Sequence, residues 1–219
     1  MTAYNLSIIS AFSVLLPLAA AIWKRQVIWR KFSFLVLILL VGGLNDLASY
    51  LAIKIHGDNM VNGNVYQLVE FVLLVCLFKK WPSYRQNYFH SVILGIGILL
   101  WVLDFCILHS LRENSSVFRV FGSILLVFVC INQINYTILN RENSIIFPRM
   151  LIKVGFALYF LYKSFIESFE LFAIPIHYPY YARFWYVQCG ISILLNVLIT
   201  IAFVCYRSTP PRSILTSGH

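Results

Sequence analysis

Charged side chains are scarce in this chain of 219 residues, since Asp, Glu, Lys and Arg together make up only 11% of it. Soluble globular proteins carry roughly 25% charged residues, so the composition excludes an ordinary soluble domain. Apolar residues make up 60% of the chain instead. This balance is typical of a polytopic membrane protein, whose first partner is the lipid bilayer.

Several motifs of catalysis and metal binding are also missing. The chain has no P-loop, no dinucleotide-binding fingerprint and no GxSxG nucleophile elbow. Its five cysteines form no CxxC pair, and its histidines form no ligand pair at helical spacing. We therefore expect no disulfide framework, no metal site and no cofactor, and we predict no catalytic residue.

Seven long apolar runs occupy most of the sequence. About 20 residues are enough for a helix to cross a bilayer, so 219 residues leave no room for a separate soluble domain. We predict a single all-α domain, a polytopic membrane protein built as a seven-transmembrane helix bundle. The predicted spans are residues 4–23, 33–53, 60–78, 88–108, 116–139, 148–171 and 182–206.

Basic residues cluster in alternate loops, which argues for membrane topology and against nucleic acid as a partner. By the positive-inside rule, the N-terminus lies outside and the C-terminus in the cytoplasm. No basic region precedes the first run, so we expect it to be retained as a span and not cleaved as a signal peptide. The loops predicted to be cytoplasmic hold Lys24, Arg25, Arg30, Lys31, Lys79, Lys80, Arg85, Arg141, Arg149, Arg207 and Arg212, whereas the opposite loops hold Lys54, Arg112 and Arg183.

Ionisable residues within the predicted spans are the strongest functional signal. A charged side chain in a membrane helix costs about 2.5 to 3.5 kcal/mol on insertion scales, so it needs a partner, a proton or a function. Three-and-four spacing places Asn45 and Asp46 on an inward stripe of the second span. It also places Tyr66 and Glu70 on one face of the third span. Asp46 and Glu70 are both expected near mid-membrane.

Two carboxylates at one depth would share a site of low dielectric constant. Because their charges repel, we expect at least one of Asp46 and Glu70 to be protonated at neutral pH, unless Lys163 or Arg119 reaches in. Most of the acidic residues within spans fall in the outer half, which predicts a polar cavity that opens outward. The candidate ligand-binding or proton-responsive residues are Asn45, Asp46, Tyr66, Glu70, Asp104, Lys163, Glu167, Gln188 and Asn196.

These candidates differ in how much they need a function. Lys163 and Glu167 are one turn apart and can pair locally. Gln188 and Asn196 belong to a stripe on the seventh span that repeats every four residues and should face the interior. Hydrogen bonds between membrane helices are enough to explain such amides, but they do not require a carboxylate at mid-membrane.

Three segments carry a resemblance to a known family. They are Pro17 in the first span, the stretch NVYQLVEF from Asn64 to Phe71, and Phe147-Pro148 leading into GFALYF from Gly155. Together they resemble a family of uncharacterised seven-helix membrane proteins common in Bacteroidetes, whose genes often lie near those for sensor histidine kinases. The resemblance implies a signalling accessory in the bacterial inner membrane and brings no activity with it.

Four functional classes remain open. The first is a sensor or receptor-like module that binds a small or lipid-like ligand in the outer cavity and acts through a signalling partner. The second is a proton-coupled small-molecule transporter, although the first three and last three spans show no internal repeat. The third is an intramembrane enzyme acting on a lipid, with carboxylates as acid and base. The fourth is a structural subunit of a larger complex.

Overall fold

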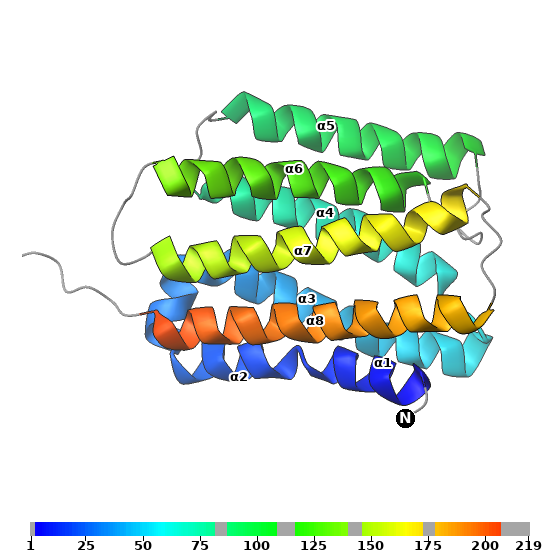
Figure 1. Ribbon diagram of the computed structural model, residues 1–219, viewed down its shortest axis with the longest axis horizontal. Coiled ribbons are helices and arrows are strands. Elements are labelled where there is room, and N and C mark those ends of the chain that lie inside the picture. The colour runs from blue at the N-terminus through cyan, green and yellow to red at the C-terminus, as the bar shows by residue number, and fades with distance from the viewer. Residues whose placement is uncertain (1–2, 82–86, 109–116, 140–145, 173–177, 207–219) are drawn as a thin grey trace, which may run out of the picture.

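The computed structural model describes residues 3–81, 87–108, 117–139, 146–172 and 178–206, and within these ranges every element is a helix (Figure 1). The prediction of an all-α fold is confirmed. The helices are α1 (Ala3–Phe12), α2 (Leu15–Trp23), α3 (Arg25–His56), α4 (Met60–Lys80), α5 (Asn87–Leu103), the π-helix η1 (Asp104–Leu108), α6 (Val117–Leu139), α7 (Ile146–Leu171) and α8 (Tyr178–Cys205).

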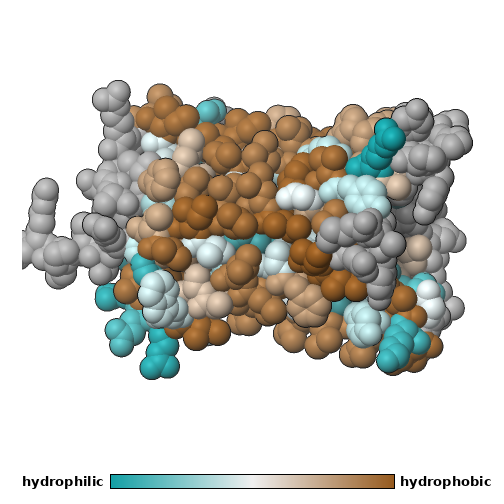
Figure 2. Space-filling model, turned by 60° about the horizontal axis from the view of Figure 1, so that its bottom comes forward, coloured by the Kyte–Doolittle hydropathy of each residue, from teal (hydrophilic) through white to brown (hydrophobic). Residues whose placement is uncertain are grey.

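Six stretches of the described chain are long and apolar enough to cross a membrane, which marks this chain as an integral membrane protein. Figure 2 shows one face of the molecule, on which apolar residues cover the middle and hydrophilic residues gather toward the two ends. α7 spans 26 residues but falls outside this set, because it carries several charged residues. The six stretches are Leu6–Trp23, Arg25–Ile55, Met60–Lys80, Tyr88–Cys106, Val117–Leu139 and Ala182–Cys205.

The helices lie side by side with their long axes roughly parallel (Figure 1). α3 packs between α2 and α4, α7 packs between α6 and α8, and α8 returns to α1 and α2. Because α4 also contacts α6, these helices form a closed ring. α5 lies outside the ring, against α4 and α6.

The first predicted span is broken in the structure. α1 ends and α2 begins on either side of a turn at Ser13. Pro17 explains the break, because it has no N–H to donate to the carbonyl of Ser13 four residues earlier, and its ring crowds that carbonyl. The Ser13 carbonyl accepts a hydrogen bond from the N–H of Leu16 instead, at 3.1 Å. The expectation of one continuous helix over residues 4–23 is therefore corrected to two helices.

The second predicted span starts earlier than expected. α3 begins at Arg25, so the basic segment that was expected to be a loop before residue 33 is helical. A backbone kink at Phe32 (φ −125°, ψ 24°) marks the position where the predicted span starts. The segment before the kink is helical because it has apolar anchors: Ile28 is fully buried, and the Phe32 ring packs edge-on against Tyr206 with centroids 5.3 Å apart.

The other helices overlap their predicted spans, with ends that differ by a few residues. One local difference concerns the span over residues 88–108, where α5 stops at Leu103 and the chain continues as the π-helix η1. A π-turn inserts one extra residue into the helix and turns the side chains that follow. Here it begins at Asp104, which is fully buried.

Most of the apolar core lies in one half of the bundle, the half that contains the α2–α3 junction and the C-terminal end of α8. On α3 the buried apolar residues lie between Ile28 and Leu39, and none of residues 40–55 is buried. Aromatic rings link the helices in this half, such as Phe78 of α4 and Phe156 of α7, whose centroids are 6.1 Å apart. The opposite half, which we call the outer half, holds two ion pairs, which involve Lys163 and Arg119.

Candidate functional site

Asp46 points along the face of α3 that forms the core lower down the helix. Ile28, Leu35 and Leu39 lie on this face and are 0%, 0% and 6% exposed. Asp46 continues the same face at three-and-four spacing, yet its side chain is exposed. This face of α3 is therefore closely packed in the inner half of the bundle and exposed in the outer half.

Glu70 and Lys163 form an ion pair across the ring. The Lys163 ammonium on α7 lies 3.3 Å from Glu70 Oε2 on α4. The two side chains are 15% and 14% exposed, so neither is sealed from its surroundings. Lys163 also lies over the rings of Tyr159 and Phe160, 5.8 Å from each centroid. The sequence predicted a protonated carboxyl group at Asp46 or Glu70 unless Lys163 or Arg119 reached the pair. Lys163 does reach Glu70.

A second ion pair lies beside the first. Arg119 Nη1 on α6 is 3.6 Å from Glu167 Oε2 on α7, and these side chains are 15% and 13% exposed. Arg119 Nη2 donates a hydrogen bond to Asn64 Oδ1 on α4 at 3.1 Å. The indole N–H of Trp101 on α5 donates to the Asn64 carbonyl at 3.2 Å. Charged and polar contacts thus join α4, α5, α6 and α7 in the outer half.

Tyr66 and Asp46 border this cluster on the side of α3. A Cβ placed at Gly42 would lie 3.1 Å from the Tyr66 hydroxyl oxygen, so α3 and α4 approach closely where this glycine leaves room. Asp46 lies close enough to Glu70 for their charges to interact. The site therefore holds three carboxylates and two cations above an apolar floor of core residues.

Two other predicted site residues, Asn45 and Asp104, have local structural partners. Asn62 Nδ2 donates to Asn45 Oδ1 at 2.9 Å, which joins the outer ends of α3 and α4. Asp104 Oδ2 accepts from the backbone N–H of Phe118 at 2.8 Å, so it caps the first turn of α6. These contacts assign Asn45 and Asp104 to helix joining and helix capping.

Asn196, in the polar stripe of α8, faces the junction of α1 and α2 and not the charged cluster. Asn196 Nδ2 donates to the Ser13 hydroxyl at 2.7 Å, at the break between α1 and α2. Ser10 donates to the Cys189 carbonyl at 3.4 Å on the same side. Gln188 Oε1 is buried and has no hydrogen-bond partner among the described residues. The structure thus brings Glu70, Lys163, Glu167, Asp46 and Tyr66 together and places Asn196 elsewhere.

Two residues of the site were not among the candidates. Arg119 was noted as able to reach an acid, and it reaches Glu167. Asn64 carries no charge. The only signal in the sequence is that a polar amide stands within an apolar span. Its full burial and its bond to Arg119 depend on how α4, α5 and α6 meet.

A second buried cation lies in the inner half. Lys153 on α7 is 2% exposed and donates to the Gln133 carbonyl at 3.1 Å and to the Thr137 hydroxyl at 2.6 Å, both on α6. These partners are neutral, and they satisfy the ammonium at the C-terminal end of α6, where carbonyl groups favour a cation. Lys153 thereby fastens α7 to α6 at the end opposite to the ion pairs.

Within the described ranges, no group of three His, Cys, Asp or Glu side chains is arranged to hold a metal ion. Comparisons with profiles of known families, with curated proteins and with solved structures found no match to this chain. What the chain does is therefore argued from its own side chains.

Proposed function

We propose that this chain is a membrane sensor, which binds a small molecule or a lipid headgroup in the outer half of its bundle and acts through a partner protein. The ligand class we assign is a zwitterion, because the site presents cations and carboxylates side by side. A seven-span topology, with α1 and α2 as one broken span, an outside N-terminus and a place in a bacterial inner membrane, belongs to the same proposal.

One observation carries the proposal: two incompletely buried ion pairs, Glu70–Lys163 and Arg119–Glu167, both converge on α7. A ligand carboxylate or phosphate can replace Glu70 beside Lys163, and a ligand ammonium can replace Lys163 beside Glu70. Since the pairs join α7 to α4 and α6, such an exchange loosens or tightens α7 against its neighbours. A ligand shifts an equilibrium between two states only by its difference in affinity for them, and exchanged ion pairs provide that difference.

The inner half supports a relay to the other membrane face. There α7 is fastened by Lys153 and packed through Phe156 against Phe78 of α4. If the outer end of α7 tilts, its inner end moves too, because the helix is rigid. The close-packed aromatic side chains around it then have to move with it, since a close-packed core has little free space. The relay would end near the α6–α7 connection, where a cytoplasmic partner would read it.

Thermal unfolding of the purified protein in a neutral detergent tests the ligand class. The probes are phosphoethanolamine, glycine betaine and the amino acids, beside acetate and ethylammonium as singly charged controls. We expect at least one zwitterion to raise the Tm of the wild type by several degrees, because a ligand that binds only the folded state stabilises it.

The response should depend on the ion pair. Glu70→Gln and Lys163→Met should abolish the shift. Asp58→Asn should keep it, because Asp58 lies in the turn before α4, where its Oδ1 accepts a hydrogen bond from the Met60 N–H at 3.3 Å. A shift of equal size in all variants, or no response to any zwitterion, contradicts the proposed ligand class.

The alternative is a proton-coupled transporter, which the broken helix α1–α2 favours. Discontinuous membrane helices often border the binding sites of transporters. Asn196 of α8 donates a hydrogen bond to Ser13 at the break. α3 also lies close to the break, because a Cβ at Gly43 would lie 3.6 Å from a side-chain carbon of Val14. Uptake of the stabilising zwitterion into proteoliposomes, driven by an inward proton gradient, would identify a transporter, whereas binding without uptake supports the sensor.

A further inference from the structure

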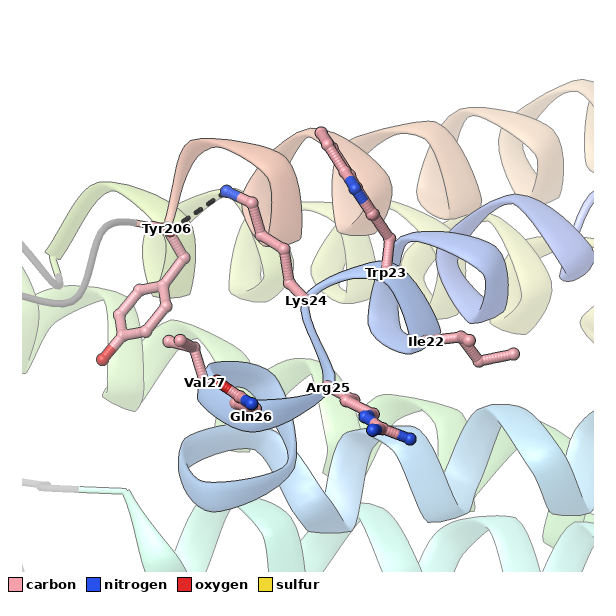
Figure 3. Close-up of a pocket in the computed structure, with 7 residues that line it drawn as sticks. All are labelled: Ile22, Trp23, Lys24, Arg25, Gln26, Val27 and Tyr206. Atoms are coloured by element: carbon pink, nitrogen blue, oxygen red, sulfur yellow. Dashed lines mark hydrogen bonds between the residues drawn. The ribbon is translucent and has the colours of Figure 1, made fainter.

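The junction between α2 and α3 forms an open pocket at the inner end of the bundle (Figure 3). α2 ends at Trp23 and α3 begins at Arg25, so Lys24 alone makes the reversal. The pocket has a volume of about 730 Å³ and is lined by residues 22–27 and Tyr206. A second hollow of about 410 Å³ shares Ile22, Arg25 and Gln26 with it and adds Trp29.

Lys24 builds one wall of this pocket. Its ammonium donates to the carbonyl of Val204 and, at 3.3 Å, to that of Tyr206, at the C-terminal end of α8. Helix C-terminal carbonyls favour a cation, so the charge of Lys24 is already satisfied there. In Figure 3, Lys24 and Trp23 extend toward α8, whereas Arg25 and Ile22 extend on the other side of the junction.

Arg25 is left with a free charge at the pocket. Its side chain is exposed and makes no hydrogen bond or ion pair with the described part of the chain. The residues that line the two hollows include no Asp or Glu, and the first turn of α3 has no acidic residue. A guanidinium and the amide of Gln26, close to a helix N-terminus, are suited to bind a phosphate.

Apolar and aromatic side chains border the same hollows. Ile22, Trp23 and Trp29 are 67%, 74% and 50% exposed, which is unusual for such residues outside lipid. Tryptophan prefers the level of the headgroups at a membrane surface, where its ring meets the start of the acyl chains. The pocket therefore combines an anion-binding group with surfaces for glycerol and acyl carbons.

We propose that the pocket at the α2–α3 junction binds the headgroup of an anionic phospholipid, with its phosphate on Arg25 and Gln26 and its glycerol and upper acyl carbons against Ile22 and Trp29. Basic pockets between helices at the cytoplasmic face are known to select anionic headgroups, and that leaflet is negatively charged. This site is distinct from the outer ion pairs; it rests on the proposed orientation, which places the α2–α3 junction at the cytoplasmic face, and not on the proposed ligand or sensor role.

Native mass spectrometry of the full chain in detergent tests this site. The purified protein is titrated with dioleoylphosphatidylglycerol or with dioleoylphosphatidylcholine, which has the same acyl chains and no net charge. We expect one phosphatidylglycerol to be retained in preference to phosphatidylcholine. Arg25→Gln should weaken its retention by about fivefold, the effect of about one basic residue near an anionic surface.

Arg30→Gln is the matched control, because Arg30 is an exposed arginine five residues along the same helix and lines neither hollow. It should retain the lipid as the wild type does. Gln26→Glu, which adds a negative charge inside the pocket, should weaken retention at least as much as Arg25→Gln. All variants should unfold at the same temperature as the wild type, since each change is on an exposed side chain.

Three results would overturn this proposal. Equal losses in Arg25→Gln and Arg30→Gln would mean a diffuse attraction to the basic end of the molecule. Equal retention of the two lipids by the wild type would mean that the pocket does not select the negative charge of the headgroup. Displacement of phosphatidylglycerol by millimolar inorganic phosphate would mean that the pocket binds a free anion and not a lipid.

Discussion

At the scale of single residues, the outer half of the bundle depends on charge balance around Lys163. Its ammonium neutralises Glu70, and Asp46 lies near enough for its charge to act on the same carboxylate. Removing the lysine leaves two acidic groups without their cation, whereas changing Glu70 to glutamine leaves an oxygen that can still accept a bond from Lys163. The two sides of the pair are therefore not equivalent.

Lys163→Met should destabilise the protein more than Glu70→Gln does. We expect a loss of about 2 to 4 kcal/mol for the lysine variant, because breaking a largely buried pair leaves an uncompensated charge. For Glu70→Gln we expect about 1 kcal/mol, the size of one hydrogen bond. Thermal unfolding in detergent measures both, and the double variant should recover part of the loss. Equal losses for the single variants would contradict this unequal dependence.

The sequence predicted most of the charged residues of this site but not which of them form ion pairs. Glu70, Lys163 and Glu167 stand out within the spans predicted from sequence, since an ionisable side chain there needs a partner. Which partners they find is decided by helix order around the ring. Lys163 pairs with Glu70 on another helix and not with Glu167 one turn away, because Arg119 of α6 takes Glu167.

At the scale of helices, small residues decide how closely the elements approach. A Cβ at Gly97 of α5 would lie 2.2 Å from an edge carbon of the Phe71 ring on α4, so this glycine allows the contact. Gly95, on the same helix, has nothing within 4 Å of its Cβ position. The pair provides a matched test of the α4–α5 packing.

Gly97→Ala should destabilise the protein, and Gly95→Ala should not. Overpacking of this kind costs about 1 to 3 kcal/mol, because the Phe71 ring must leave its place. An alanine at the open position adds up to about 1 kcal/mol of helix propensity instead. Unfolding midpoints in detergent distinguish the two, and a midpoint for Gly97→Ala at or above that of the wild type would show that α5 is not packed in this way.

The break between α1 and α2 is fastened by one side chain of α8. Asn196→Leu should cost about 1 kcal/mol, because it removes the bond to the Ser13 hydroxyl, and bonds between membrane helices are of this size. Thr200→Val should be close to neutral, since the Thr200 hydroxyl only donates to the Asn196 carbonyl of its own helix. Thermal unfolding of both variants checks this; an equal effect would mean that the stripe has no specific partner.

The helix ends show where sequence reasoning works and where it stops. Hydrophobic length locates the helices, because a bilayer requires about 20 apolar residues for each span. It does not locate breaks within them: Pro17 marks a defect, but the turn at Ser13 is kept by its contact with α8. Nor does it show that basic residues before Phe32 continue as a helix, since this follows from burial of Ile28 in the ring.

At the scale of the whole molecule, the inner half of the ring holds most of the apolar core together with basic residues, and the outer half holds the pairs of acidic and basic residues. This division agrees with the proposed orientation, in which the basic α2–α3 junction faces the cytoplasm. In a variant without the five native cysteines, a single cysteine at Asp58 should react with a membrane-impermeant thiol reagent from outside intact cells. A single cysteine at Lys79 should not react. The reverse pattern would overturn the orientation.

The central claim is that the core face of α3 opens to the outside at Asp46. The direct measurement places a single cysteine at Asp46 or at Leu44, in the same cysteine-free background, and labels intact cells with the impermeant reagent. Leu44 is the matched position, because it is 65% exposed and lies on the opposite face of α3, which the proposed arrangement turns to lipid. We predict that Asp46→Cys is labelled from outside and Leu44→Cys is not. No labelling of Asp46→Cys, in cells where Asp58→Cys is labelled, would contradict the account.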